Sequence, residues 1–292
     1  LQGSMVALVT PMNVDASIDW LSLDKLVEFH VAEGTNTIVA VGTTGESATL
    51  SVGEHLQVIE RVVERVNGRI SVVAGTGANS TSEAVELTKS AQSVGVDACL
   101  LVVPYYNKPT QEGLYLHFKQ IASQVDIPII LYNIPGRSGV NMTPDTIARL
   151  AADFKNIIGV KEAAGSIPQA SKILQLCGMD FLVLSGEDAL NYSLLTIGAR
   201  GFISVTANIA PKDVSNLYNL YADGEFEKAR DLHYKLLPLN EALFIETNPI
   251  PIKAALSMMD MMKYEYRLPL SEMAPENYDE LKKTLSDYGL IS

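Results

Sequence analysis

The chain has 292 residues, 47% of them hydrophobic, so it can bury a large core in one α/β barrel with an appendage or in two domains. The net charge of -12, without any cluster of Lys or Arg, argues against nucleic acid or an anionic membrane surface as a partner. No apolar run is long enough to span a membrane, and the N-terminus does not resemble a signal peptide, so we expect a cytoplasmic protein.

Apolar runs rich in β-branched residues recur along the chain and predict buried strands. The runs begin at Met5, Thr37, Ile70, Ala98, Pro128, Ile157, Phe181 and Gly201. Segments of helical periodicity lie between them; the first opens at Ser22 and repeats apolar residues at Leu23, Leu26 and Val27. Gly34, Gly95 and Gly198 occur where the C-terminal caps of such helices are expected.

This alternation of strand and helix predicts a parallel sheet that is covered on both faces. The eight strand signals fit a closed (β/α)8 TIM barrel, and an open doubly wound sheet is the alternative fold. From Pro211 onward only helical patterns remain. We therefore predict a catalytic barrel over residues 1–224 and a small all-helical C-terminal domain over residues 225–292.

Polar and reactive residues follow the predicted strands, at the end of the barrel where enzymes of this architecture hold their active sites. These segments are GTTGES from Gly42, GTGANST from Gly75, PYYNKPT with Tyr105 and Tyr106, YNIPGRSG with Tyr132 and Arg137, Lys161 with Glu162, SGED from Ser185, and Ile203 with Ser204. The topology alone therefore gathers them at one face.

Lys161 ends the apolar run IIGVKEAAG, where a charged ammonium group would be costly to bury. A structural ion pair with Glu162 is one explanation, but adjacent residues of a strand point to opposite faces. The other explanation is chemical, because burial lowers the pKa of an amine and a neutral amine attacks carbonyl carbons to form Schiff bases.

The other groups also have plain structural explanations. Tyr132 could be a tyrosine of the barrel rim, and GTTGE could be a tight turn as well as a nest of backbone N–H groups for a carboxylate. GTGANST lacks the spacing of a nucleotide-binding loop. The four histidines are scattered, so we predict no metal site, and Lys161 remains as the group that activates a carbonyl substrate.

Five motifs in series resemble the pyruvate-dependent class I aldolases, the family that includes dihydrodipicolinate synthase and N-acetylneuraminate lyase. They are GTTGESATL, PYYNKPTQEGLYLHF, LYNIPGRSG, GVKEA and NPIPIK, and the resemblance covers essentially the whole chain. Arg137 and the double threonine of GTTGE favour the dihydrodipicolinate synthases, although Ser138 stands where their pattern usually has threonine. The alternatives are an N-acetylneuraminate lyase, another pyruvate-dependent aldolase, or a ligand-binding barrel without catalysis.

The resemblance implies a role for each residue of the site. Lys161 would capture pyruvate as a Schiff base, with no other cofactor, and Tyr132 would act beside it as general acid and base. Thr43 and Tyr106 would complete a hydroxyl relay, with Tyr106 reaching the neighbouring subunit of a homotetramer built from two dimers. Thr44 would bind the pyruvate carboxylate, and Arg137 the carboxylate of L-aspartate 4-semialdehyde. Gly186 and Ile203 would form walls, and the product would be 4-hydroxy-tetrahydrodipicolinate, on the diaminopimelate route to lysine.

The resemblance also implies feedback inhibition by L-lysine at a dimer interface. The residues that match this allosteric site are Ser47, His55, Asn79, Glu83 and Tyr105. Val52 departs from the pattern, since some lysine-sensitive relatives have histidine there, so we expect weak or partial inhibition. Ordinary first-turn helix residues are the alternative reading of Glu83 and His55.

Overall fold

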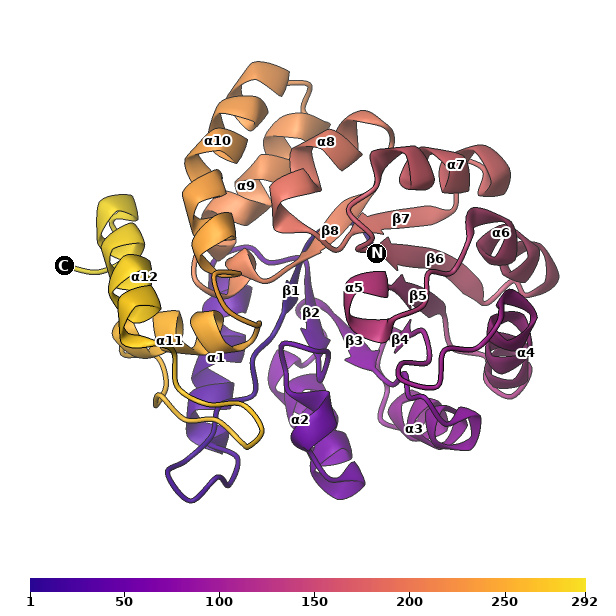
Figure 1. The fold of residues 1–292 in the computed structure, drawn as a ribbon, viewed down its shortest axis with the longest axis horizontal. Helices are drawn as coiled ribbons and strands as arrows, with labels where there is room; N and C mark the ends of the chain where they lie inside the picture. Colours follow the sequence, from indigo (N-terminus) through magenta and orange to yellow (C-terminus); the bar gives the residue numbers. More distant parts are fainter.

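The computed structural model describes residues 1–292, and its eight parallel strands close into a barrel in chain order (Figure 1). The strands are β1 (Gly3–Ala7), β2 (Thr37–Ala40), β3 (Ser71–Gly75), β4 (Ala98–Val102), β5 (Ile129–Asn133), β6 (Ile157–Glu162), β7 (Leu182–Ser185) and β8 (Gly201–Ser204). Since β1 pairs with both β2 and β8, the predicted barrel is confirmed and the open sheet is excluded.

Helices cover the outside of the barrel and continue beyond it. Those between and after the strands are α1 (Trp20–Ala32), α2 (Val52–Val66), α3 (Thr81–Ser93), α4 (Gln111–Ala122), α5 (Pro135–Ser138), α6 (Pro144–Asp153), α7 (Ile167–Cys177), α8 (Asn191–Thr196) and α9 (Pro211–Ala222). Short 3-10 turns are η1 (Ser47–Thr49), η2 (Asp188–Leu190) and η3 (Thr206–Asn208). The C-terminal helices are α10 (Phe226–Ala242), α11 (Ile250–Met258) and α12 (Pro275–Tyr288).

Capping interactions set the ends of the helices. The first helix begins at Trp20, two residues before the predicted Ser22, because the Asp19 carboxylate accepts a hydrogen bond from the Ser22 N–H at 3.1 Å. Gly34, Gly95 and Gly198 follow α1, α3 and α8 with φ of 83°, 85° and 108°, which confirms the predicted C-terminal ends.

Alternation along the strands divides the buried residues into two cores. The outer core lies between the strands and the helices and includes Val6. The inner core fills the barrel and includes Met5 and Ala7 on either side of Val6, as well as Tyr132 and Ile203. Side chains of the inner set near the carboxyl ends of the strands are the ones that reach the site.

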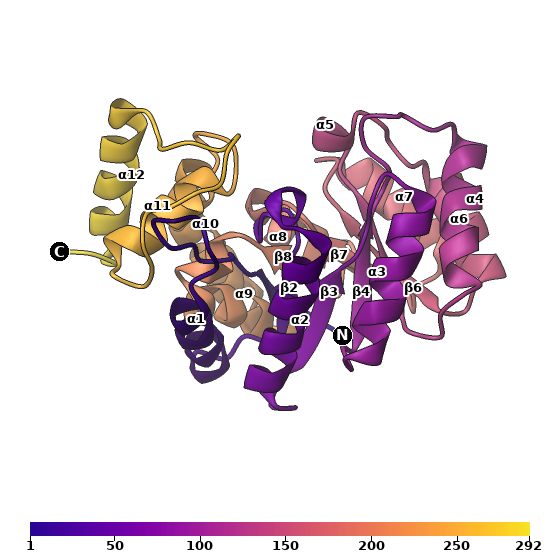
Figure 2. The ribbon, with the colours of Figure 1, turned by 90° about the horizontal axis from the view of Figure 1, so that it is seen from below.

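The C-terminal helices lie together on one side of the barrel (Figures 1 and 2). α10 packs against α9, α12 packs against α10 and α11, and the outer core extends to Leu281 and Leu285 of α12. A turn at Gly224, with φ of 81°, separates α9 from α10, and a domain boundary near residue 225 stays a prediction. None of the helices combines the length and the apolar character needed to cross a membrane.

Candidate active site

Lys161 lies on β6 with only 7% of its surface exposed, and it takes part in none of the ion pairs of the molecule. The neighbouring strand places Tyr132 beside it in register, and the Lys161 ammonium lies 4.3 Å from the centre of the Tyr132 ring. A tyrosine ring attracts a cation more weakly than a carboxylate does. The amine is therefore desolvated without a carboxylate to hold its charge.

Glu162 does not pair with Lys161, because it points to the other face of β6. Its carboxylate accepts hydrogen bonds from the Ala164 N–H at 2.8 Å and from the Asn133 amide at 3.2 Å. The residue is 2% exposed, and burial raises the pKa of its carboxyl group. This geometry excludes the structural ion pair that the sequence left open.

A small pocket surrounds Lys161 at the carboxyl ends of the strands. Its lining includes all the predicted catalytic and substrate-binding residues except Tyr106: Lys161, Tyr132, Thr43, Thr44, Arg137, Gly186 and Ile203. Apolar residues such as Val39, Leu100 and Val205 complete the wall. The side chain of Tyr106 is 90% exposed and lies outside this pocket.

Gly186 packs directly against the lysine. A Cβ atom at this position would lie 2.9 Å from Cε of Lys161 and 2.7 Å from Cβ of Ala163. Such distances are shorter than real Cβ contacts. The absence of a side chain at Gly186 therefore leaves the room that Lys161 occupies.

The loop after β2 brings two hydroxyl groups to the pocket. Thr43 is half-buried, whereas Thr44 is buried and its hydroxyl accepts a hydrogen bond from the side-chain amide of Asn248 at 3.0 Å. The Asn248 carbonyl in turn accepts a hydrogen bond from the Arg137 guanidinium at 2.8 Å. Asn248 thus ties together the two residues that the sequence assigns to the carboxylates of the two substrates.

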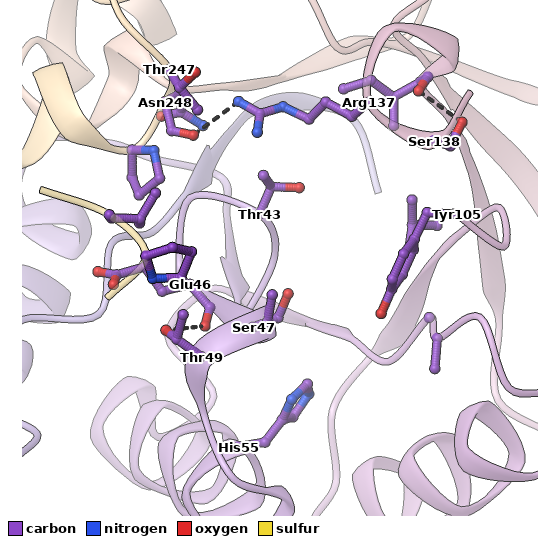
Figure 3. A pocket seen from close by; sticks show the side chains of 18 of the residues that line it. Thr43, Glu46, Ser47, Thr49, His55, Tyr105, Arg137, Ser138, Thr247 and Asn248 are labelled. Carbon is purple, nitrogen blue, oxygen red and sulfur yellow. Dashed lines mark hydrogen bonds between the residues drawn. The ribbon is translucent and has the colours of Figure 1, made fainter. Parts of the chain in front are cut away.

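A larger cavity of about 380 Å³ opens next to the lysine pocket, and Thr43, Ile134, Arg137 and Asn248 line both (Figure 3). Figure 3 shows the Arg137 side chain reaching across the cavity toward Asn248, above Thr43. Arg137 therefore borders both the larger cavity and the pocket of Lys161.

Most of the predicted lysine-binding residues line this larger cavity rather than a separate one. They are Ser47, His55, Glu83 and Tyr105. Asn79 does not line this cavity, but its side-chain amide donates a hydrogen bond to the backbone carbonyl of Tyr105 at 3.2 Å. Val52 is exposed on α2. The His55 ring bonds the Gly75 carbonyl at 2.7 Å, and burial lowers the pKa of its imidazole.

Two residues near the site were not predicted individually, although both belong to the NPIPIK motif. Asn248 contacts Thr44 and Arg137, and Lys253 forms a buried ion pair with Glu46 of the GTTGE loop. The NPIPIK motif indicated the family, but the contacts of Asn248 and Lys253 become visible only in the folded structure. No group of His, Cys, Asp and Glu side chains is arranged to hold a metal ion.

These observations define a class of protein. A (β/α)8 barrel that buries a lysine outside any ion pair beside a tyrosine ring, with an arginine in the same pocket, has side chains suited to a lyase that acts on carbonyl substrates bearing carboxylates. The chain belongs to the Dihydrodipicolinate synthetase family, whose sequence model matches residues 1–288.

Individual relatives are similar over their whole length. The 4-hydroxy-tetrahydrodipicolinate synthase of Thermodesulfovibrio yellowstonii is 56% identical over 290 residues, which cover 99% of each chain. The crystal structure of chloride-inhibited dihydrodipicolinate synthase from Acinetobacter baumannii, complexed with pyruvate, is 50% identical, covers 99% of each chain and has a TM-score of 0.97. A DHDPS from Cyanidioschyzon merolae with lysine bound is 38% identical, with the same coverage and a TM-score of 0.97.

Proposed function

We propose that this chain condenses pyruvate with L-aspartate 4-semialdehyde to give 4-hydroxy-tetrahydrodipicolinate, on the diaminopimelate route to lysine. The observation that best supports this proposal is the buried Lys161 amine, which has no carboxylate partner and lies 4.3 Å from the centre of the Tyr132 ring. The names of the full-length relatives and the pyruvate complex of the Acinetobacter baumannii enzyme support the same reaction. The cytoplasm is the proposed location, which the acidic composition favours over a membrane surface.

The first half of the reaction forms a covalent intermediate on Lys161. The neutral amine attacks the ketone carbon of pyruvate, and loss of water leaves an iminium ion. The positive nitrogen makes the adjacent methyl group acidic, so loss of a proton gives an enamine. No cofactor is needed, because the iminium nitrogen itself accepts the electron pair.

Tyr132 is the proposed proton carrier for these steps, since it is the hydroxyl-bearing residue next to Lys161 in register. A free tyrosine has a pKa near 10, which makes it a poor base at neutral pH. A relay through Thr43 to a second tyrosine, Tyr106 of another copy of the chain, would move protons to solvent without a full phenolate.

The second half of the reaction joins the enamine carbon to the aldehyde carbon, and the aldehyde oxygen takes up a proton to become the 4-hydroxyl group. The amino group of the same substrate then attacks the iminium carbon and displaces the Lys161 amine, which closes the ring and frees the enzyme. Thr44 is proposed to bind the carboxylate of pyruvate, while Gly186 and Ile203 form the walls. Arg137 offers a planar fork that binds the carboxylate of the aldehyde through two hydrogen bonds, which a lysine cannot do.

Kinetics of Arg137→Ala test the assignment of the second substrate. We expect the KM for the aldehyde to rise by an amount equivalent to roughly 2–4 kcal/mol, with little change in the KM for pyruvate. Arg149→Ala on α6 is a matched control, because that arginine pairs with Glu112 on the outer surface. Unchanged aldehyde kinetics in Arg137→Ala, or cleavage of N-acetylneuraminate in place of the condensation, would contradict the proposal.

Inhibition by L-lysine and assembly into a homotetramer of two dimers extend the proposal. The lysine-bound relative supports the first, and the carboxylate of Glu83 in the larger cavity is the natural partner for the ammonium group of lysine. Val52 leads us to expect partial inhibition. Steady-state rates with and without millimolar lysine test this point, and rates that do not change at all would refute it.

A further inference from the structure

A second lysine is buried more deeply than Lys161. Lys253 lies on α11, and its ammonium forms an ion pair with the carboxylate of Glu46. Both side chains are 0% exposed, and the ring of Tyr266 lies 5.3 Å from the ammonium. The pair is the only ion pair of the molecule in which both side chains are fully enclosed.

Stability is a poor explanation for this pair. Removing two charges from water costs as much as their attraction returns, so apolar residues of similar volume stabilise a fold equally well or better. One carboxylate oxygen of Glu46, Oε2, is buried without any hydrogen-bond partner. The pair is therefore not arranged for the greatest stabilisation, and its value lies in the geometry that it imposes.

That geometry concerns the loop that carries Thr43 and Thr44. Val41 and Glu46 stand at the two ends of this loop, and both have a left-handed backbone, with φ of 53° and 58°. Residues other than glycine keep this conformation only where surrounding contacts enforce it. The ion pair supplies such a contact at Glu46, at the end of the loop.

The partner of Glu46 comes from a rigid element that also contacts the site. Lys253 lies about one turn into α11, and Asn248, just before that helix, forms hydrogen bonds with the Thr44 hydroxyl and the Arg137 guanidinium. The loop after β2 is thus held to the same segment twice, once through Thr44 and once through Glu46. Neither Glu46 nor Lys253 lines the pocket of Lys161.

We propose that Glu46 and Lys253 are positioning residues, which fix the loop of residues 42–46 so that Thr43 and Thr44 face Lys161 in the geometry that Schiff-base formation requires. This inference rests on the proposed function, since it concerns the capture of pyruvate. It predicts that the pair affects the rate of chemistry more than the stability of the fold.

The double variant Glu46→Gln/Lys253→Met tests the proposal, because it removes both charges and keeps the approximate volume of both side chains. We expect it to fold, with a melting temperature near that of the wild type. We expect borohydride trapping of pyruvate on Lys161 and kcat to fall about 10- to 100-fold, as misplacement by about 1 Å does in other enzymes. The KM for pyruvate should rise more than the KM for the aldehyde.

A matched control removes an exposed ion pair in the same way. Glu112→Gln/Arg149→Met eliminates a pair between α4 and α6 whose side chains are 59% and 49% exposed, and its kinetics should equal those of the wild type. Glu46→Asp gives a second test, since it keeps the charge but shortens the connection by one methylene. It should also slow the trapping of pyruvate.

Each outcome decides the question. A folded double variant, or a folded Glu46→Asp variant, that traps pyruvate at the wild-type rate overturns the inference. Failure of both variants to fold would assign the pair to the fold and would also overturn it. Absence of any pyruvate adduct in the wild type is a different result, because it contradicts the proposed function itself.

Discussion

At the scale of single residues, the two buried lysines, Lys161 and Lys253, differ in the groups that surround their amines. Lys253 has a carboxylate beside it, whereas Lys161 lies beside the ring of Tyr132 and packs against Gly186. An ammonium held in an ion pair is occupied by its carboxylate, whereas an amine without such a partner is available to attack a carbonyl carbon. The contacts of each lysine therefore distinguish the structural amine from the reactive one.

Removal of the Tyr132 hydroxyl should separate catalysis from folding. In Tyr132→Phe the ring stays beside Lys161 but the proposed proton carrier is lost, so we expect kcat to fall about 100-fold or more with little change in melting temperature. The control is Tyr115→Phe, which removes a hydroxyl that donates to Asp153 at 2.8 Å on the outside of the barrel. A Tyr132→Phe enzyme with nearly normal kcat would contradict the proposed role.

Addition of one methyl group at Gly186 should displace the nucleophile. We expect Gly186→Ala to reduce the rate of pyruvate trapping at least tenfold, because the new Cβ would lie 2.9 Å from Cε of Lys161. Gly53→Ala on α2 is the matched control, since a Cβ there meets nothing within 4 Å. Equal trapping rates in the two variants would show that Lys161 does not need the room at Gly186.

At the scale of elements, α2 begins with a capping box that is joined to the C-terminal segment. The Ser51 side chain accepts from the Glu54 N–H, and the Glu54 carboxylate accepts from the Ser51 N–H. The same carboxylate accepts hydrogen bonds from both ends of the Arg267 guanidinium. Hydrogen bonds from Arg267, and then from Ser51, lower the pKa of Glu54 to about 2.

Loss of this carboxylate should have a pH-dependent cost. The pKa of Glu54 in the folded protein, about 2, is below its ordinary value of 4.5, so its stabilising effect is complete above about pH 4.5 and disappears as the pH falls toward 2. We expect Glu54→Gln to lower the free energy of unfolding by about 1 kcal/mol at pH 7. Melting temperatures of both proteins, measured at pH 7 and near pH 3, should converge at the lower pH.

The control for this experiment is Glu64→Gln, on the same helix, because Glu64 is 70% exposed and lies 3.8 Å from its partner Arg61. Its melting temperature should equal that of the wild type at both values of pH. If the difference in melting temperature between Glu54→Gln and the wild type grew as the pH fell, it would contradict a lowered pKa of Glu54 in the folded protein.

The elements that the sequence predicts well are those defined by local patterns. Each β-branched run became a strand, because continuous apolar residues need burial on both faces of a parallel sheet. The helix α5 within YNIPGRSG was not predicted, since four residues are too few to show a period. The start of α1 was predicted two residues late, because Asp19 was not recognised as its cap.

At the scale of the whole molecule, the unpredicted parts of the site depend on contacts between distant parts of the chain. Asn248 and Thr44 are 204 residues apart, and Lys253 and Glu46 are 207 residues apart. No local pattern reports such a pairing, which arises only when the C-terminal helices pack beside the closed barrel. The topology predicted that Tyr132 and Lys161 lie at the same end of the barrel, and the family resemblance predicted that they are neighbours, which the pairing of β5 with β6 confirms.

The exposed position of Tyr106 leads to a prediction about assembly. Its side chain is 90% exposed, and within one chain it does not line the pocket of Lys161. If its hydroxyl belongs to the relay, the active species contains at least two copies of the chain. Sedimentation during turnover should show a dimer or tetramer, and Tyr106→Phe should lower kcat. A fully active monomer would contradict the shared relay.

The proposed reaction is tested most directly by identifying the lysine that captures pyruvate. The protein is incubated with pyruvate, reduced with borohydride, digested, and examined by mass spectrometry for the modified peptide. We expect a reduced pyruvate adduct on Lys161 and none on Lys253, which is held in an ion pair. An unmodified Lys161 in the folded protein, or an adduct on another lysine, would contradict the assignment of Lys161 as the nucleophile.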